Sequence, residues 1–154
     1  WFGQGMDGSY VFMWGVAEDG TFQPFADNLR SLGKAGARPS TIFAATGVIN
    51  TSDERLKQQF RSVVDAEKAA ALEIKATIGM FKFNDAVDEK GDAARWHVGV
   101  NAQQVVSILE SHDLNPFDYG FVCYDEWEES ETGPAGSQYA IRYDELIMFI
   151  LSAM

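Results

Sequence analysis

The chain has 154 residues and a mass of 17.1 kDa, a length typical of one domain or of a small domain with an extension. Its 12 basic and 23 acidic residues give a net charge of −11, which opposes binding to nucleic acid and to anionic membrane surfaces. No run approaches the roughly 20 apolar residues of a membrane span, and the single cysteine excludes an internal disulfide framework.

The first 50 residues predict short strands joined by tight turns. They hold eight of the 14 glycines, and their four acidic and three basic residues leave nearly all of the negative charge to the rest of the chain. Residues 10–14 (YVFMW) and 41–45 (TIFAA) are short runs of aromatic, β-branched and small apolar residues, bounded by turn signals such as Asp19 followed by Gly20. No helical period of apolar residues is present here.

The pattern changes after residue 51. Apolar residues recur at spacings of three and four from Leu56 to Ile74, and Thr51 followed by Glu54 has the form of a capping box. We therefore predict a helix over residues 53–76. A strand is expected next, over residues 79–83, and then an exposed loop of charged and small residues over 84–94.

The second half of the chain predicts two more helices. The first covers residues 102–111 and is followed by Pro116, which cannot continue it. A strand over 121–124 and a solvated acidic loop over 125–136 come next. The last helix, over 143–154, is apolar on most of its circumference, which predicts burial on several sides.

Both parts of the chain are more easily understood as one chain's share of an oligomer. A two- or three-stranded piece is marginal in water, and the last helix has more apolar surface than a short chain can cover. We therefore predict that the chain is one subunit of an oligomer.

The sequence offers little for a metal or cofactor. His97 and His112 are 15 residues apart and have no zinc-type spacing to each other or to Cys123. A Gly-x-Gly-x-x-Gly spacing begins at Gly3, but no strand precedes it and no helix opens after it, as a dinucleotide site requires. We expect no cofactor.

The acidic loop could be interpreted as a glycosidase carboxylate pair, which needs two carboxyl groups roughly 5–9 Å apart. We favour a charged loop that keeps the chain soluble, and we interpret the four tryptophans as core or interface residues rather than a sugar platform. The acidic residues concerned are Asp125, Glu126, Glu128, Glu129 and Glu131.

Residues 50–57 (NTSDERLK) lie where the two parts meet, and they contain a candidate Ser–Lys dyad, Ser52 and Lys57. In such a dyad a lysine must be neutral to accept the hydroxyl proton, so its ordinary pKa of about 10.4 has to be lowered by burial or nearby cations. Arg55 could supply positive charge, although its acidic neighbours oppose it. The alternative is that the serine caps a helix and the lysine is solvated.

Helix geometry restricts this dyad. Residues five apart on a regular helix lie about 140° apart around its axis, so Ser52 and Lys57 would not face one another there. Catalysis within one chain therefore requires Ser52 to precede the helix and Lys57 to reach back along the first turn.

Three stretches, in this order, resemble one known family. Residues 42–57 read IFAATGVINTSDERLK, residues 95–105 read RWHVGVNAQQV and residues 143–149 read YDELIMF. They resemble the corresponding elements of bacteriophage tail-spike and tail-fibre proteins with a C-terminal intramolecular chaperone domain, the endosialidase-type auto-processing peptidase family. Departures are mild: Gln104 stands where Glu is usual and Asn101 where an apolar residue is common.

The resemblance implies an α+β fold in two parts. Residues 1–51 would be the end of a β-rich trimeric tail-fibre stalk. Residues 52–154 would be a mainly α-helical intramolecular chaperone and auto-processing domain, with long helices in an intertwined homotrimer. The partners implied are two further copies of the chain and the upstream stalk of the same polypeptide, with no nucleic acid and no membrane.

The resemblance also implies a function. The C-terminal domain would drive trimerisation and folding of the stalk and then release itself by serine autoproteolysis between Thr51 and Ser52. Ser52 matches the nucleophile, Lys57 the general base, and His97 a motif histidine that would orient or polarise the cleavage site. The alternative is a structural trimerisation cap that never cleaves. The protein would be made in the host cytoplasm, with the mature upstream part in the virion tail and the chaperone released.

Overall fold

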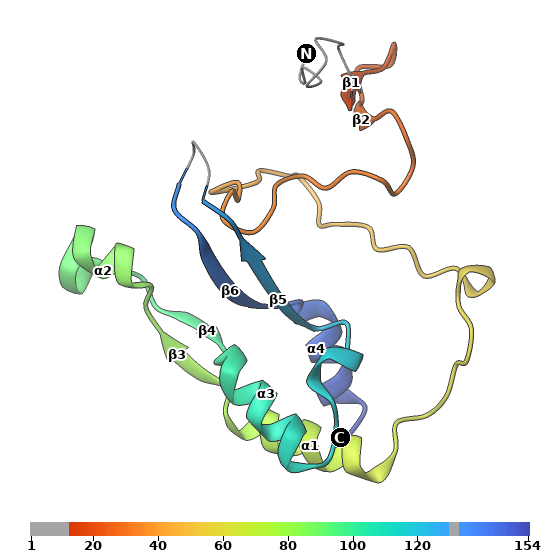
Figure 1. The fold of residues 1–154 in the computed structure, drawn as a ribbon, viewed down its shortest axis with the longest axis vertical. Helices are drawn as coiled ribbons and strands as arrows, with labels where there is room; N and C mark the ends of the chain where they lie inside the picture. The colour runs from red at the N-terminus through yellow and green to blue at the C-terminus, as the bar shows by residue number, and fades with distance from the viewer. Residues whose placement is uncertain (1–12, 130–132) are drawn as a thin grey trace. The chain divides into compact units, whose positions relative to one another are not determined.

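The computed structural model describes residues 13–129 and 133–154 (Figure 1). The chain divides into two compact units, Trp1–Ala45 and Thr46–Met154. No helix among the described residues is long and apolar enough to cross a membrane.

The described part of Trp1–Ala45 contains one antiparallel hairpin, formed by β1 (Trp14–Val16) and β2 (Phe22–Pro24). The rings of Trp14 and Phe22 stack across it, with centroids 5.0 Å apart. The turn contains Gly20 at φ +85°, a conformation that residues with a side chain rarely adopt. Short strands joined by a tight turn are therefore confirmed for this part of the chain. The observed strand shares only Trp14 with the predicted strand 10–14, of which residues 10–12 lie outside the described residues.

The predicted strand over residues 41–45 is wrong. These residues have no strand structure, and the Phe43 side chain is 96% exposed. A strand needs a neighbour to accept its ladder hydrogen bonds, and the described residues of this unit provide none for this segment. Its apolar and β-branched composition therefore does not produce a strand in the single chain.

The helix predicted over residues 53–76 is correct only in its second half. A single turn of 3₁₀ helix, η1 (Glu54–Leu56), is followed by extended chain, and α1 begins at Asp65 (Asp65–Ala76). The predicted capping box at Thr51 and Glu54 is also wrong: the Asp53 carboxylate caps η1, accepting a hydrogen bond from the backbone N–H of Arg55 at 2.9 Å. Gln59 has φ +56°, which interrupts any helical continuation.

The loop predicted over residues 84–94 is a short helix. β3 (Gly79–Phe81) pairs antiparallel with β4 (His97–Gly99), and α2 (Asn84–Lys90) and η2 (Gly91–Ala93) lie between them. Asp85 in the first turn and Lys90 in the last turn complement the helix dipole. Gly91, at φ +55°, ends the helix. Charges at both ends and the glycine that follows thus favour a helix that has no apolar period, and its N-cap residue, Phe83, makes no side-chain hydrogen bond.

The acidic loop is shorter than predicted because its ends belong to a hairpin. β5 (Val122–Trp127) pairs antiparallel with β6 (Gly136–Ile141), so residues 125–127 lie in a strand, and β6 was not predicted. The rings of Tyr124 and Tyr139 lie opposite each other in this register, with centroids 4.6 Å apart. Glu131 lies outside the described residues.

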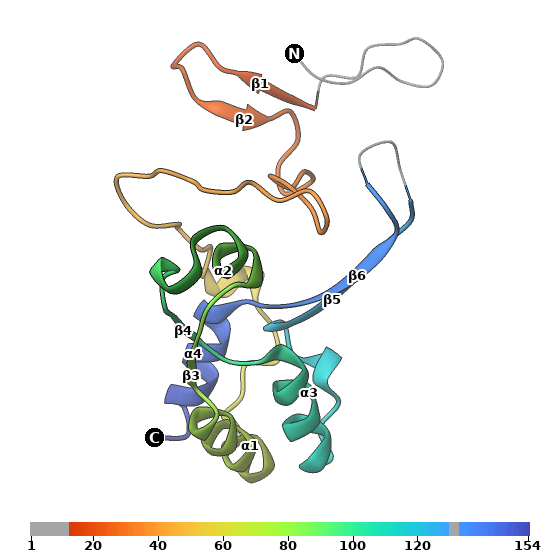
Figure 2. The same ribbon diagram turned by 90° about the vertical axis from the view of Figure 1, so that its left-hand side faces the viewer.

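The core of Thr46–Met154 lies between α1, α3 (Ala102–Ser111) and α4 (Tyr143–Leu151). Figures 1 and 2 both show these helices side by side, with the β5–β6 hairpin projecting from them. The short η3 (Pro116–Asp118) follows α3. The buried cluster consists of Ala70, Ile74, Val105, Ile108, Leu109, Phe121, Val122, Leu146 and Ile150.

The helix predicted over 102–111 is confirmed, and the last helix ends at Leu151 rather than residue 154. Only one face of α4 is buried: Leu146 is 1% exposed, whereas Ile147 and Met148 are 52% and 67% exposed.

The described residues together form a mixed helix and small-sheet protein, with four α-helices and three two-stranded sheets.

Candidate functional site

Ser52 and Lys57 lie together in the structure. The Lys57 Nζ donates a hydrogen bond to the Ser52 Oγ over 2.7 Å. Ser52 precedes the single turn of η1 and Lys57 follows it, with extended backbone at both Asp53 and Lys57. One 3₁₀ turn between extended residues thus brings together two side chains that a regular α-helix would hold about 140° apart.

Two charged side chains between Ser52 and Lys57 form an ion pair with each other. The Arg55 guanidinium forms a bidentate interaction with the Asp53 carboxylate. This hydrogen bond lowers the pKa of Asp53 and raises the pKa of Arg55. Because its charge is matched by Asp53, Arg55 provides little of the positive field that the sequence suggested for the dyad.

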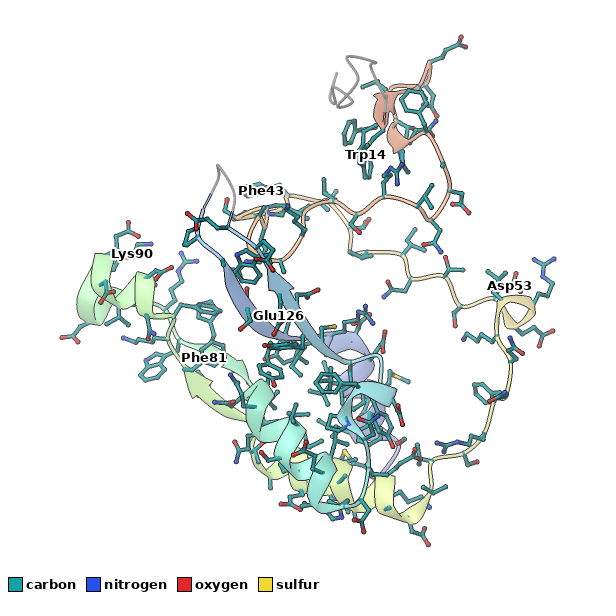
Figure 3. All side chains as sticks on the ribbon, in the orientation of Figure 1. Trp14, Phe43, Asp53, Phe81, Lys90 and Glu126 are labelled. Carbon is teal, nitrogen blue, oxygen red and sulfur yellow. The ribbon has the colours of Figure 1, made fainter. Side chains whose placement is uncertain are left out.

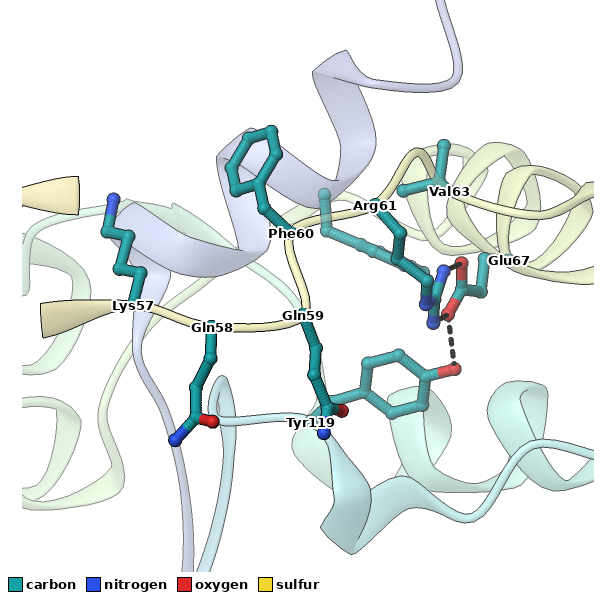
Figure 4. A pocket seen from close by; sticks show the side chains of 9 residues that line it. Lys57, Gln58, Gln59, Phe60, Arg61, Val63, Glu67 and Tyr119 are labelled. Atoms are coloured by element: carbon teal, nitrogen blue, oxygen red, sulfur yellow. Dashed lines mark hydrogen bonds and ion pairs between the residues drawn. The ribbon is translucent and has the colours of Figure 1, made fainter. Parts of the chain in front are cut away.

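The segment around the dyad is open to solvent in the single chain. Ser52 and Lys57 are both exposed, and none of residues 46–64 is buried. A groove of about 450 Å³ begins at Lys57 and runs along Gln58, Gln59 and Phe60 towards Tyr119 (Figure 4). Most of the surface that lines the groove is apolar, although several of its residues, such as Lys57, Gln58 and Arg61, have polar side chains.

A buried carboxylate lies at the far end of this groove. Glu67, on α1, is 3% exposed, and it pairs with the guanidinium of Arg61. The Tyr119 hydroxyl donates a third side-chain bond to it, drawn in Figure 4. The Arg61 hydrogen bonds lower the pKa of Glu67 to about 2 against the cost of burial. Burial, together with the bond to Glu67, raises the pKa of Tyr119 to about 12.

A second contact holds the amino side of the dyad. The Asn50 Nδ2 donates to the Asp144 Oδ2 over 2.9 Å, which links the chain two residues before Ser52 to the first turn of α4. Neither this contact nor the Glu67 cluster was predicted from the sequence.

His97 is not part of this arrangement within one chain. It lies on β4 with an exposed side chain, and its ring packs against Phe81 and Phe83, with centroids 5.7 and 4.9 Å apart. Figure 3 shows Asp53, the neighbour of Ser52, and Phe81 well separated. The structure thus brings together two of the three predicted site residues.

Among the described residues, the first two members of the acidic cluster do not face each other, and the histidines are not grouped with other metal ligands. Asp125 and Glu126 are consecutive in β5, so their side chains point to opposite faces of the hairpin and cannot act as a facing pair. The His112 ring lies 2.8 Å from the Glu73 carboxylate. Among residues 13–129 and 133–154, no group of three or more His, Cys, Asp or Glu side chains could hold a metal ion.

Comparisons with known proteins agree with the sequence motifs. Residues 52–114 match the family model described as chaperone of endosialidase. The side tail fiber protein pb1 of Escherichia phage T5 is 39% identical over 156 residues, an alignment that covers 89% of this chain and 11% of that protein. The chain thus spans about a tenth of the length of this relative.

Two solved structures share the fold. The carboxy-terminal domain of the bacteriophage T5 L-shaped tail fiber with its intra-molecular chaperone domain has a TM-score of 0.79 and 36% identity, over 91% of this chain and 37% of that one. A structure described as a novel intramolecular chaperon has a TM-score of 0.60 and 41% identity, over 67% of this chain and 94% of that one.

The fold and the matched motifs define an intramolecular chaperone domain. The chain belongs to the chaperone-of-endosialidase family, as the sequence resemblance predicted.

Proposed function

We propose that this chain is the end of a phage tail-fibre precursor that cuts itself between Thr51 and Ser52. Residues 52–154 are the chaperone and auto-processing domain, and residues 1–51 are the end of the mature stalk. The observation that carries the proposal is the 2.7 Å hydrogen bond from the Lys57 amine to the Ser52 hydroxyl. A nucleophile within reach of a base is the arrangement that covalent catalysis needs.

The reaction is a single-turnover cleavage. Lys57, in its neutral form, accepts the proton of the Ser52 Oγ, and the oxygen attacks the carbonyl carbon of Thr51. The carbon–nitrogen bond to Ser52 then breaks, and the nitrogen leaves as an amine after receiving a proton from Lys57. Water hydrolyses the resulting ester, leaving a carboxylate on Thr51 and the free amine and hydroxyl of Ser52.

The proposal includes an intertwined homotrimer. Several large apolar side chains are exposed in the single chain, among them Ile49 at 94%, Phe60 at 91% and Met148 at 67%. Burying such side chains between copies is favourable, by roughly 25 cal/mol per Å² of apolar surface. The exposed side chains support assembly, and the family resemblance implies that the partners are two further copies of the chain and the upstream stalk of the same polypeptide.

Trimerisation gives the chaperone its physical role. A stalk built from short strands of three chains has a large loop-closure cost before its non-local contacts form. A domain that trimerises first holds the chains at high effective concentration and reduces that cost. Cleavage after assembly removes the easy route back, so the mature fibre persists because it unfolds slowly.

Assembly also favours the chemistry. A lysine gives up its charge more readily when it is removed from water, and neighbouring copies that cover residues 46–64 would shield Lys57. His97 is separated from the dyad within its own chain, so its proposed orienting role requires that it come from a neighbouring copy. Synthesis takes place in the host cytoplasm, the stalk enters the virion tail, and the chaperone is released.

Replacement of the nucleophile tests the proposal. We expect the purified wild-type chain to give two bands on a denaturing gel, residues 1–51 and 52–154, and Ser52→Ala to give one. Ser62→Ala, at an exposed serine ten residues away, is the matched control and should cleave like the wild type. A single intact band from the wild type would favour the alternative, a trimerisation cap that does not cleave.

A further inference from the structure

We infer that Arg61, Glu67 and Tyr119 form a positioning cluster that fixes the segment carrying Ser52 and Lys57 to the helical core. The inference rests on the proposed self-cleavage and concerns how fast assembled chains cut themselves. None of the three residues contacts the reacting atoms, so each acts through the placement of Lys57 and Ser52.

The cluster has four hydrogen bonds to one buried carboxylate. The Glu67 Oε1 accepts from the Arg61 Nη2 at 2.6 Å and from the Tyr119 hydroxyl at 3.1 Å. The Glu67 Oε2 accepts from the Arg61 Nη1 and from the backbone N–H of Val64, both at 2.8 Å. The donors come from the segment after the dyad, from the start of α1 and from the end of η3.

The segment that carries the dyad has few other attachments. None of residues 46–64 is buried, and the chain between Lys57 and α1 has no regular structure. Arg61 is four residues beyond Lys57, and residues 57–61 line the same groove as Tyr119 (Figure 4). On the other side, Asn50 is bound to Asp144. The dyad thus lies between two attachments, of which the Glu67 cluster has more hydrogen bonds and is the more buried.

Placement matters because the proposed reaction depends on two side chains in one geometry. A misplacement of about 1 Å can slow a catalysed step by roughly 100-fold. The guanidinium of Arg61 is planar and binds both carboxylate oxygens, which restricts orientation as well as distance. Glu67 is ionised throughout the neutral range, since the pKa of its carboxyl is about 2. The ion pair that attaches the segment is therefore present at every neutral pH at which the dyad would act.

The test separates assembly from cleavage. The 154-residue chain is produced by cell-free synthesis, trimers are isolated on native gels at successive times, and denaturing gels give the cleaved fraction within them. We expect Glu67→Gln to lower the first-order rate constant of cleavage by about tenfold or more. Arg61→Lys keeps the charge but loses the planar fork, and Tyr119→Phe loses one hydroxyl, so we expect smaller reductions in that order. In each variant the shape of the pH–rate profile should be unchanged, because the base is the same.

Glu73→Gln is the matched control. Glu73 lies on the same helix, is 53% exposed and pairs with His112 rather than with the dyad segment. Its trimers should cleave within about twofold of the wild-type rate.

Assembled Glu67→Gln and Arg61→Lys chains that cleave at the wild-type rate constant would overturn the inference. So would an equal slowing in Glu73→Gln. If Glu67→Gln does not assemble, Arg61→Lys and Tyr119→Phe decide by the same criterion. An uncleaved wild-type chain would instead remove the proposed self-cleavage, and the inference with it.

Discussion

Both units of the chain contain large apolar side chains, but only one of the units buries them. All 11 buried hydrophobic residues among those described lie in Thr46–Met154, whereas none of residues 13–45 is buried. Residues 13–45 do not lack apolar side chains: Phe43 is 96% exposed, and Leu32 and Ile42 are 61% and 68% exposed. What they lack in the single chain is a surface on which to pack.

The difference follows from how each unit obtains its contacts. Helices α1, α3 and α4 bury their apolar faces against one another within about 90 residues of chain. Short strands separated by glycines cannot do this locally, because strands are stabilised by pairing with other strands. The contrast agrees with the proposed stalk, whose strands other copies would complete, and with a helical unit that already has a buried core within one chain.

The largest expected effect comes from truncating one large apolar side chain in each of the two units and comparing the losses of stability. Leu109 is fully buried in the core, so Leu109→Ala should lower the free energy of unfolding by about 3 kcal/mol. Phe43→Ala removes more atoms but from an exposed position, and should change the unfolding of Thr46–Met154 by less than about 0.5 kcal/mol. Near-UV circular dichroism in denaturant measures both.

If Leu109→Ala and Phe43→Ala lowered the free energy of unfolding equally, the contrast between the two units would be wrong. Equal losses would mean that residues 13–45 share a cooperative core with the helices. Measurements at several protein concentrations separate this from an effect on assembly, because only assembly depends on concentration.

The next largest effect is a loss of stability in acid. The folded-state pKa of Glu67, about 2, is below its ordinary value of 4.5, so its contribution is present above pH 4.5 and is lost as the pH falls towards 2. Glu67 is buried, but its partner Arg61 is 60% exposed and therefore screened by solvent. We expect the free energy of unfolding of the wild type to exceed that of Glu67→Gln by at most about 3 kcal/mol at pH 7, and by little near pH 2.

Thermal unfolding of both chains between pH 2 and pH 7 checks this expectation. Asp65→Asn is the control, since Asp65 is fully exposed on the same helix and pairs only loosely with Lys68, at 3.5 Å. A gap between wild type and Glu67→Gln that stays constant with pH would show that Glu67 stabilises α1 without its charge.

A smaller effect is expected at the β3–β4 hairpin, where two glycines face each other. Gly99 pairs with Gly79, but a Cβ on Gly99 would collide with the Tyr143 hydroxyl, whereas a Cβ on Gly79 would lie an ordinary 3.8 Å from the Thr77 carbonyl oxygen. We expect Gly99→Ala to cost about 2 kcal/mol and Gly79→Ala less than about 0.5 kcal/mol. Equal costs in urea unfolding would mean that the close approach of Tyr143 is not what requires glycine at position 99.

The errors in the sequence-based fold have a common physical cause. The apolar period from Leu56 through Phe60 and Val63 predicted a helix, yet Leu56 and Phe60 are 75% and 91% exposed. A period shows which side chains could share a face, but a helix forms only if that face finds a partner. The reverse error occurred at α2, a helix that has no buried residue and whose end charges complement its dipole.

The candidate site was predicted only where its residues are close in sequence. Ser52 and Lys57 are five residues apart, and a family motif singled them out. Tyr119, by contrast, contributes to the Glu67 cluster from 52 residues away. The signal nearest to that cluster was the glutamate three residues after Val64, but valine cannot cap with its side chain, so a search for capping boxes does not find it.

The smallest effect we predict concerns the N-cap residue of α3. The Asn101 side chain accepts hydrogen bonds from the backbone N–H groups of Gln103 and Gln104 at 3.0 and 3.3 Å. Asn101→Ala should therefore cost about 1 kcal/mol, and Asn101→Asp, which keeps the acceptor, close to none. If alanine and aspartate have the same unfolding midpoint, the cap does not stabilise α3. If only Asn101→Ala is destabilised, the stability of Thr46–Met154 depends on the capping of its helix ends as well as on its buried core.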